Sequence, residues 1–550
     1  MKALLWFLIP LALAVAAILF LAHDSKADSP TLPKTAFLGT LQDELARADD
    51  STTGPDLFLS TCQQAAPAAP STNVNLIVGD SINTGAGRNH GCFTPQNEPA
   101  IAVNPLDPSN LVAGSNDYRD CCITDTTGEK RNDGGGYAYV SRDGGKSWLN
   151  IRLPGVTRLS GARGRFRVID SAGDPSIAFG PDGTAYYANM GFSRTTSDSF
   201  ILLSVSRDGG LTWGLPHVVQ YDNPPAFSPM IFNDKEWVAV APNGRVYVTW
   251  TRFVGDAYGN LQSANIVIRS SGDRGQHWGP LRTVSPRHLY SQGSQPQVAP
   301  DGTVYVAYEA ASPLANYMQD AIVVARSTDQ GRTWHEREVG RAYDDSNCFP
   351  IDWTSGRQIL SGEEFRINSF PSFAVDPVTG AMTLAWADNR GTANCGNAPS
   401  TTAGLDLFVG ATSNQVEVVT SQDGLRFSAP RAVTSGPDKS MPAVAMRAGV
   451  AVVSYYVRSP NDSPACSPDG ATLGYPACLD YAYSTSRDGW ATSRVLTDAP
   501  SNPFVQFGGQ FFGDYTGVAI GSNGVAHAVW TDNRGGFAPN QDIFGAAFVP

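Results

Sequence analysis

The chain has 550 residues, of which 55 are glycine and 38 proline, and 10% are aromatic, a composition typical of short strands joined by tight turns. The formal net charge of -12 argues against nucleic acid as a partner, because phosphate binding relies on a surplus of Lys and Arg. No long helical periodicity follows the N-terminus, so we predict an all-β fold.

The N-terminus carries a run of apolar residues from Leu4 to Ala22, directly behind Lys2. This pattern predicts a signal peptide or a membrane anchor over residues 1–23, with cleavage and retention both open. Residues 24–73 are rich in Ala, Pro, Ser, Thr and Asp and predict a linker with one short helical element. The rest of the chain is therefore expected outside the cytoplasm: secreted, periplasmic, or anchored on the outer side of the membrane, which it would touch only through the N-terminal segment.

The eight cysteines are an even number, which suits an oxidising compartment. Their positions in predicted loops favour Cys466–Cys478 and Cys348–Cys395 disulfides, whereas Cys62 and Cys92 are expected to pair with Cys121 and Cys122 in an order left open. The cysteines lack zinc-type spacing, so we expect no metal ligand set among them and no cofactor, with a structural calcium ion left open.

An octet of the form S-x-D-x-G-x-x-W recurs along the chain. In it, Ser and Asp side chains suit hydrogen bonds to the turn's own amides, Gly suits a positive φ, and the aromatic residue covers the neighbouring strand. We call it the octet turn and expect a structural role for its Asp. Four good copies and two degraded ones place that residue at Asp143, Asp208, Asp273, Asp329, Asp423 and Asp488.

A second repeating pattern alternates with the octet turns along the chain. It consists of seven segments, each with an apolar strand, a short turn and another apolar strand. Several of the turns are hairpin dipeptides, such as Asp182-Gly183 and Asn243-Gly244. Each unit reads as four strands, which predicts a seven-bladed β-propeller over residues 74–550, with six blades as the alternative. The last unit supplies three strands, and we expect residues 74–78 to add the fourth and close the ring.

The octet resembles the Asp-box, or BNR repeat, of the sialidase (neuraminidase) superfamily. The resemblance implies a propeller and, less specifically, glycoside hydrolysis, since Asp-boxes also occur in propellers that cleave no sugar. Sialidases proper are six-bladed, so a seventh unit departs from their pattern.

Strand direction alternates within a blade, so the first-strand entries and the loops between second and third strands share one face. These loops are long, and we call this side the long-loop face, where recognition of a glycan or other anionic ligand is expected. Polar residues stand at the first-strand entries, namely Glu98, Asp174, Asp234, Arg366 and the Asp514-Tyr515 pair. Arginines stand after the second strands, namely Arg119, Arg252, Arg390, Arg458 and Arg534. Either each arginine pairs with a nearby Asp and orders a loop, or several converge on a carboxylate ligand.

The family resemblance extends to two short stretches. Phe365-Arg366-Ile367 is similar to the family's Phe/Tyr-Arg-Ile-Pro motif, although Asn368 replaces the Pro and the unit is the fifth. Gly513-Asp514-Tyr515-Thr516 resembles the entry to the family's last blade. The resemblance implies Tyr515 as nucleophile and Arg366 as a carboxylate ligand. Position on the long-loop face and at the central channel makes Glu98 or Glu236 the candidate partner of Tyr515 and Asp174 or Asp234 the candidate acid. Strand direction leads us to expect Arg366, Arg390, Arg534 and Tyr515 in one cleft near the mouth of the channel.

Three functions remain open on the sequence. The first is an exported exo-α-sialidase or related glycoside hydrolase acting on terminal acidic sugars, towards which the interpretation leans. The second is a noncatalytic propeller that binds glycan or protein, and the third is a membrane-tethered assembly factor.

Overall fold

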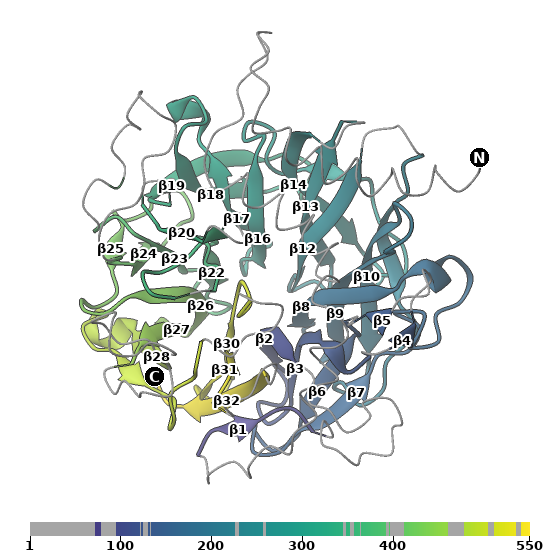
Figure 1. The fold of residues 1–550 in the computed structure, drawn as a ribbon, viewed down its shortest axis with the longest axis horizontal. Helices are drawn as coiled ribbons and strands as arrows, with labels where there is room; N and C mark the ends of the chain where they lie inside the picture. The colour runs from purple at the N-terminus through teal and green to yellow at the C-terminus, as the bar shows by residue number, and fades with distance from the viewer. Residues whose placement is uncertain are drawn as a thin grey trace, which may run out of the picture. The chain divides into compact units, whose positions relative to one another are not determined.

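Seven four-stranded antiparallel sheets follow one another along the chain and form the blades of a β-propeller in the computed structural model (Figure 1). The structure describes residues 72–78, 95–120, 123–124, 130–131, 134–225, 230–256, 260–344, 348–352, 357–363, 365–391, 395, 412–459, 478–503, 511–534 and 541–550. All of these fall in one compact unit, Lys34–Pro550. The predicted count of seven blades is confirmed and the six-bladed alternative is excluded.

The first four blades are built from consecutive strands, apart from a small hairpin inserted in the first. Blade 1 contains β2 (Gln96–Val103), β3 (Leu111–Asp117), β6 (Tyr137–Ser141) and β7 (Leu149–Arg152), with β4 (Ile123–Thr124) and β5 (Lys130–Arg131) as the insertion. Blade 2 contains β8 (Ser171–Phe179), β9 (Ala185–Phe192), β10 (Ser199–Ser206) and β11 (His217–Asp222). Blade 3 contains β12 (Ile231–Val240), β13 (Val246–Gly255), β14 (Leu261–Ser271) and β15 (Arg282–Thr283), and blade 4 contains β16 (Ser291–Val298), β17 (Val304–Ala311), β18 (Asp320–Ser327) and β19 (His335–Ala342).

A second small hairpin, β20 (Ile351–Asp352) with β21 (Arg357–Gln358), precedes the fifth blade. Blade 5 contains β22 (Ser372–Val375), β23 (Met382–Asp388), β24 (Gln415–Ser421) and β25 (Arg431–Ala432). Blade 6 contains β26 (Lys439–Arg447), β27 (Val450–Arg458), β28 (Leu479–Thr485) and β29 (Arg494–Val495), and blade 7 contains β30 (Gly517–Ile520), β31 (Ala526–Asp532) and β32 (Asp542–Phe548). The described helices are short 3-10 turns: Tyr118–Asp120, Gly164–Val168, Pro313–Ala315 and Ser486–Asp488.

The ring closes through β1 (Val74–Asn75), which is the outer strand of blade 7. Val74 pairs with Gly545 and Asn75 with Phe544, and the Leu76 amide donates to the Ile543 carbonyl at 2.8 Å. The predicted closure by residues 74–78 is therefore confirmed. No helix within the described residues has the length and apolar content needed to cross a membrane, and the expected signal or anchor at residues 1–23 lies outside them.

Apolar clusters fill the spaces between adjacent blades, because the two faces of each sheet pack against different neighbours. Successive side chains of a strand point to opposite faces, so Tyr187 packs towards blade 1 and Tyr186 towards blade 3. Blades 3, 5 and 7 each contain a fully buried indole ring, that of Trp250, Trp386 and Trp530 respectively. The first strands of neighbouring blades contact one another around the whole ring, from β2 through β8, β12, β16, β22, β26 and β30 back to β2. Residues entering these strands are therefore brought together at the centre.

Candidate functional site

The innermost strands share a β-bulge at the end that opens on the long-loop face. Register shifts occur in five first strands, between Asn97/Ala100, Gly173/Ser176, Asp234/Trp237, Gln292/Gln295 and Ser440/Ala443. The first residue of each bulge has a positive φ: Glu98 (56°), Asp174 (53°), Lys235 (54°), Gly293 (66°) and Met441 (50°). A bulge re-aims a side chain, and a left-handed non-glycine residue stores backbone strain of the kind found at functional sites.

Charged side chains from the bulges of blades 1, 2 and 3 and from the segments that enter blades 5 and 7 meet at the centre. They form what we call the central cluster, Glu98, Asp174, Lys235, Arg366 and Asp514. The Lys235 ammonium lies 2.7 Å from an Asp514 carboxylate oxygen and 3.5 Å from one of Asp174. Arg366 binds Asp514 with both ends of its guanidinium, at 3.0 Å from Nε and 2.9 Å from the terminal nitrogen. All five side chains are buried, so these charges interact in a medium that screens them weakly.

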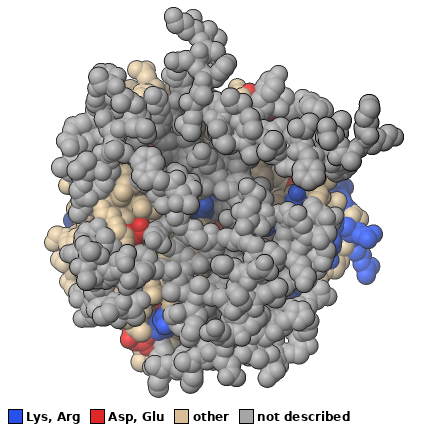
Figure 2. Space-filling view, in the orientation of Figure 1, with Lys and Arg blue, Asp and Glu red and all other residues tan. Residues whose placement is uncertain are grey.

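Backbone and amide contacts hold the two remaining acids of the central cluster in place. One Glu98 oxygen accepts from the Asp514 amide at 3.0 Å, and the other accepts from Asn116 Nδ2 at 2.6 Å. The side-chain oxygen of Asn116, Oδ1, accepts from the backbone amide of Asp174 at 2.6 Å. Asn116 thus links the bulges of blades 1 and 2. Space-filling atoms of both charge signs are seen between the grey ones on this side of the molecule (Figure 2).

Glu236 and Tyr515 lie beside the central cluster, on the walls of a cavity of about 30 Å³. A cavity of this size holds one or two water molecules and not a sugar ring, so a glycan would approach the cluster from the long-loop face. Burial, together with the charges of Asp174 and Asp234, raises the pKa of Glu236 well above its ordinary value. The Tyr515 ring packs edge-on against Trp237, with ring centres 5.6 Å apart.

The other acid proposed as a catalytic residue from sequence, Asp234, is fully buried next to this group. One of its carboxylate oxygens lies 3.8 Å from the Lys235 ammonium. The structure thus places Glu98, Asp174, Asp234, Arg366 and Tyr515 near one another, whereas Arg390 and Arg534 pair with Asp388 and Asp532.

Each arginine that follows a second strand, which we call a rim arginine, has at least one carboxylate partner. Arg119 binds Asp117 at 2.5 Å, Arg252 binds Asp222 at 3.0 Å and Arg390 binds Asp388 at 2.7 Å. Arg458 binds Glu363 and Asp438 at 2.7 and 3.0 Å, and Arg534 binds Asp532 and Asp498 at 2.7 and 2.5 Å. Arg119, Arg390 and Arg534 thus show the local Asp-x-Arg pair that the sequence left as an alternative to convergence, whereas Arg252 and Arg458 bind carboxylates of other segments. Arg366 binds Asp514 in the central cluster.

The recurrent Trp-x-Asp-Asn-Arg pattern has a local physical cause. In blade 5, Asp388 accepts from the Trp386 indole at 2.8 Å and from the guanidinium of Arg390. In blade 7, Asp532 accepts from the Trp530 indole at 2.9 Å and from Arg534 at 2.7 Å. The Asp therefore satisfies a buried indole N–H and fixes the loop that follows.

The octet turns lie on the opposite side of the blades and are closed by their own hydrogen bonds. Asp143 accepts from the amides of Lys146 and Ser147, both at 3.0 Å, and from the Ser147 hydroxyl at 2.5 Å. These bonds lower the pKa of this exposed carboxylate to about 2. Equivalent turn contacts are made by Asp208, Asp273, Asp329 and Asp423, and Asp488 binds Arg494 at 3.0 Å.

A cavity of about 450 Å³ lies between the octet turns of blades 3 and 4. Its walls include Arg245, Asp273, His277 and Arg332. Asp273 there is engaged by its own turn and by His277 Nδ1 at 2.6 Å, so this cavity offers exposed cations rather than paired acids.

The disulfide between Cys348 and Cys395 is confirmed and joins the entry of blade 5 to the loop after β23. Cys478 is disulfide-bonded, but its expected partner Cys466 lies outside the described residues, as do Cys62, Cys92, Cys121 and Cys122. In a chain-entropy model the loop closed by the Cys348–Cys395 bond stabilises the fold by about 4 kcal/mol.

Several solved structures are similar to this chain in fold. A Penicillium chrysogenum α-L-arabinanase, complexed with arabinobiose, matches at 15% identity over 71% of this chain and 94% of its own, with a TM-score of 0.40. The Hadza microbial sialidase Hz136 matches at 14% identity over 76% and 73%, with a TM-score of 0.40. A Trypanosoma rangeli sialidase matches at 15% identity over 72% and 58%, with a TM-score of 0.39. No family model and no curated protein sequence matches the chain.

Sequence reasoning missed Lys235, the cation that joins Asp174 to Asp514. The signal was present in the register: residues Ala100, Ser176 and Trp237 occupy equivalent positions opposite the second strand, which aligns Lys235 with Glu98 and Asp174. Lys235 was not predicted because only acidic residues were considered as candidates at this position of the strand entries.

Proposed function

We propose that this chain is a glycoside hydrolase whose reaction takes place at the central cluster on the long-loop face. The observation that carries the proposal is the opposed environments of two carboxyl groups on one cavity wall. Glu236 lies near Asp174 and Asp234 in a buried setting that favours its proton, whereas Asp514 lies between two cations, Lys235 and Arg366. Pairs of carboxyl groups held in different protonation states divide the acid and base roles in glycosidases.

In this mechanism Glu236 supplies the proton that the leaving group needs, through a water molecule in the adjoining cavity. Asp514 keeps Lys235 and Arg366 in place through its two ion pairs. Tyr515, next to Asp514, is the candidate nucleophile, and its phenol proton passes to Glu98 as its bond to the sugar forms. Glu98 and Asn116 orient the Asp514 backbone and the Asp174 bulge. The strained bulge residues keep these groups in position before substrate arrives.

Acidic sugars are the substrates that the Asp-box resemblance favours. A sugar carboxylate would compete with Asp514 for the Nε edge of the Arg366 guanidinium, because Asp514 accepts from both nitrogens of that edge. We therefore propose hydrolysis of a terminal glycoside as the activity and sialosides as one of the substrate classes to be tested.

The test is hydrolysis of a panel of aryl glycosides, including α-sialosides and α-L-arabinofuranosides, by the purified protein. Glu236→Gln should lower kcat by about 10²–10⁴ for a poor leaving group and far less for dinitrophenolate, which departs without a proton. Tyr515→Phe should reduce the rate for both leaving groups. Hydrolysis of no glycoside, or equal losses for the two leaving groups in Glu236→Gln, would contradict the assignment.

A noncatalytic binding propeller is the second candidate, and the pairing of the rim arginines with carboxylates favours it. On this alternative the long-loop face binds a glycan or protein without cleaving it. Glycan-array binding that is unchanged in Glu236→Gln and Tyr515→Phe, without hydrolysis, would establish this second function.

Export of the chain also remains a proposal, based on the apolar run at residues 4–22. The Cys348–Cys395 disulfide supports it, because such bonds persist in oxidising compartments. Fusion of residues 1–33 to a reporter that folds only outside the cytoplasm should give active reporter, and an inactive fusion would contradict export.

A further inference from the structure

Three acidic side chains lie together at the long-loop edge of blade 4, away from the central cluster. Glu309 is near the end of β17, Asp320 begins β18, and Asp344 lies two residues beyond β19. Asp320 pairs with Ala311 on one side and Ala342 on the other. Because side chains alternate along a strand, Glu309 and Asp320 point to the same face of the sheet. Asp344 follows Ala342 by two residues and lies toward that face as well.

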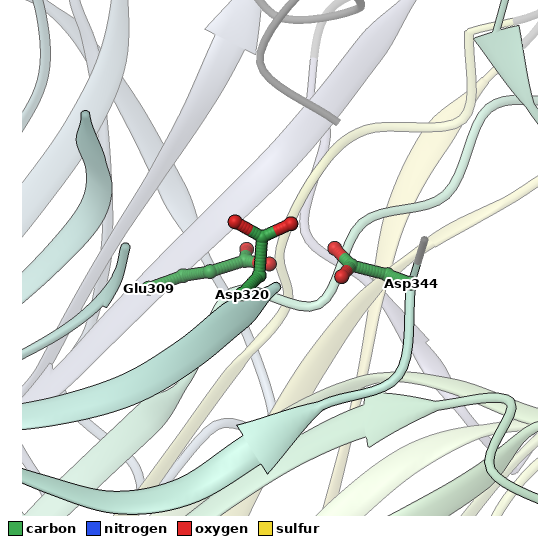
Figure 3. A group of neighbouring side chains, drawn as sticks. All are labelled: Glu309, Asp320 and Asp344. Atoms are coloured by element: carbon green, nitrogen blue, oxygen red, sulfur yellow. The ribbon is translucent and has the colours of Figure 1, made fainter. Parts of the chain in front are cut away.

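The three carboxylates face a common space. One ligand oxygen from each lies within 4.8 Å of the others, and the side chains point toward one another (Figure 3). The residues are only 5%, 1% and 1% exposed for Glu309, Asp320 and Asp344. Burying three like charges at this separation is unfavourable unless a proton or a cation compensates them.

Glu309 gives the observation that points to a ligand. Its Oε1 atom is buried and has no hydrogen-bond partner, although the side chain is 95% shielded from solvent and directed into the cluster. Oε1 therefore meets no protein donor, whereas the side chain of Glu309 is otherwise engaged with Asp344.

We propose that Glu309, Asp320 and Asp344 bind a calcium ion. All three donors are hard carboxylate oxygens, which suit Ca²⁺ or Mg²⁺ and not the softer metals. The burial of the site favours Ca²⁺, because Mg²⁺ usually keeps several of its water ligands. Backbone carbonyls or water molecules would complete the coordination.

The ion would join two parts of the chain that the sheet alone does not connect. Glu309 and Asp320 belong to the second and third strands of blade 4, whereas Asp344 begins the segment that leads through Cys348 to Arg366. Calcium would therefore order the entry to blade 5 together with the disulfide.

The experiment measures calcium binding to the whole protein after treatment with EDTA and exchange into metal-free buffer. Titration with CaCl₂, followed by calorimetry and thermal unfolding, should show a site whose occupancy raises the unfolding temperature. Glu309→Gln should weaken this site by about 100-fold or more, since even residues that only support a metal ligand contribute 10–100-fold. Bound calcium, measured by mass spectrometry, should fall by one equivalent per chain.

The matched control is Glu417→Gln, which removes another buried glutamate from β24 of the neighbouring blade and should leave the calcium affinity unchanged. Asp344→Asn is a second test if Glu309→Gln does not fold. Absence of calcium binding in the wild-type protein, or equal affinity in wild type and Glu309→Gln, would overturn the proposal and show that the three acids are compensated by shared protons.

Discussion

The octet turns and the central cluster both contain aspartates held by hydrogen bonds, but they place these residues in opposite environments. Asp143 is exposed and accepts bonds from its own turn, within four residues. Asp514 is buried and is bound by Lys235 and Arg366 from other blades. The comparison teaches that a repeated aspartate can be a local folding device, whereas an aspartate whose partners come from distant blades depends on the closed ring.

Among the substitutions that test this comparison, removal of Asp514 should lower the free energy of unfolding the most. Asp514→Ala leaves Lys235 and Arg366 buried without the carboxylate that they share, so we expect the free energy of unfolding to fall by about 3–5 kcal/mol. Urea unfolding followed by tryptophan fluorescence would measure it. A loss below about 1 kcal/mol, the range of exposed pairs, would show that the central cluster is no more coupled than the rim.

Glycine substitution tests the tight packing of the bulges. An alanine at Gly293 would place its Cβ 2.6 Å from Cγ of Phe370 at a φ of 66°, so overpacking of about 1–3 kcal/mol should add to about 1–2 kcal/mol of left-handed strain. Gly302→Ala is the control, because its φ is 84° and nothing lies within 4 Å of the new atom. Equal losses of unfolding free energy for the two variants would contradict close packing at the centre.

The pH dependence of stability should distinguish the buried acid Glu236 from the exposed turns. A carboxyl group whose pKa is raised on folding holds its proton more tightly in the folded state, so stability declines as pH rises above about 4.5 towards the folded pKa. One such proton corresponds to a slope of about 1.4 kcal/mol per pH unit. Glu236→Gln should remove this slope between about pH 5 and 7, and an unchanged profile from urea unfolding at several pH values would argue against a buried, protonated Glu236.

The smallest effect is expected at a single octet turn. Asp143→Asn should lower the free energy of unfolding by about 0.5–1.5 kcal/mol at neutral pH, because it weakens hydrogen bonds that are exposed to water. Since the pKa of Asp143 is lowered to about 2, this contribution is present above the ordinary value of 3.8 and is lost as pH falls towards 2. Acid unfolding of wild type and variant should therefore converge near pH 2, and a difference that persists there would contradict the charged-acceptor role.

The sequence predicted the parts of the fold that depend on short-range patterns. The blade count, the closing strand and the Cys348–Cys395 disulfide follow from strand pairs, turn dipeptides and loop positions. The ion pair between Asp388 and Arg390 is also short-range, because these residues are two positions apart. Arg366 and Asp514 are 148 residues apart, and their contact depends on how blades 5 and 7 approach across the ring. Neither periodicity nor spacing specifies that distance, so the sequence placed Arg366 at a first-strand entry like Asp514 but did not predict that the two residues form an ion pair.

The closing strand sets an order of events during synthesis. Asn75 binds Asp542, a residue made 467 positions later, so one edge of blade 7 is available before its partner exists. At ribosomal rates of about 5–20 residues per second, the early strand waits roughly 20–90 s for β32 to emerge. Blades 1 to 6 have complete sets of strands before then, whereas the ring of blades is closed only when β32 has been made and pairs with β1.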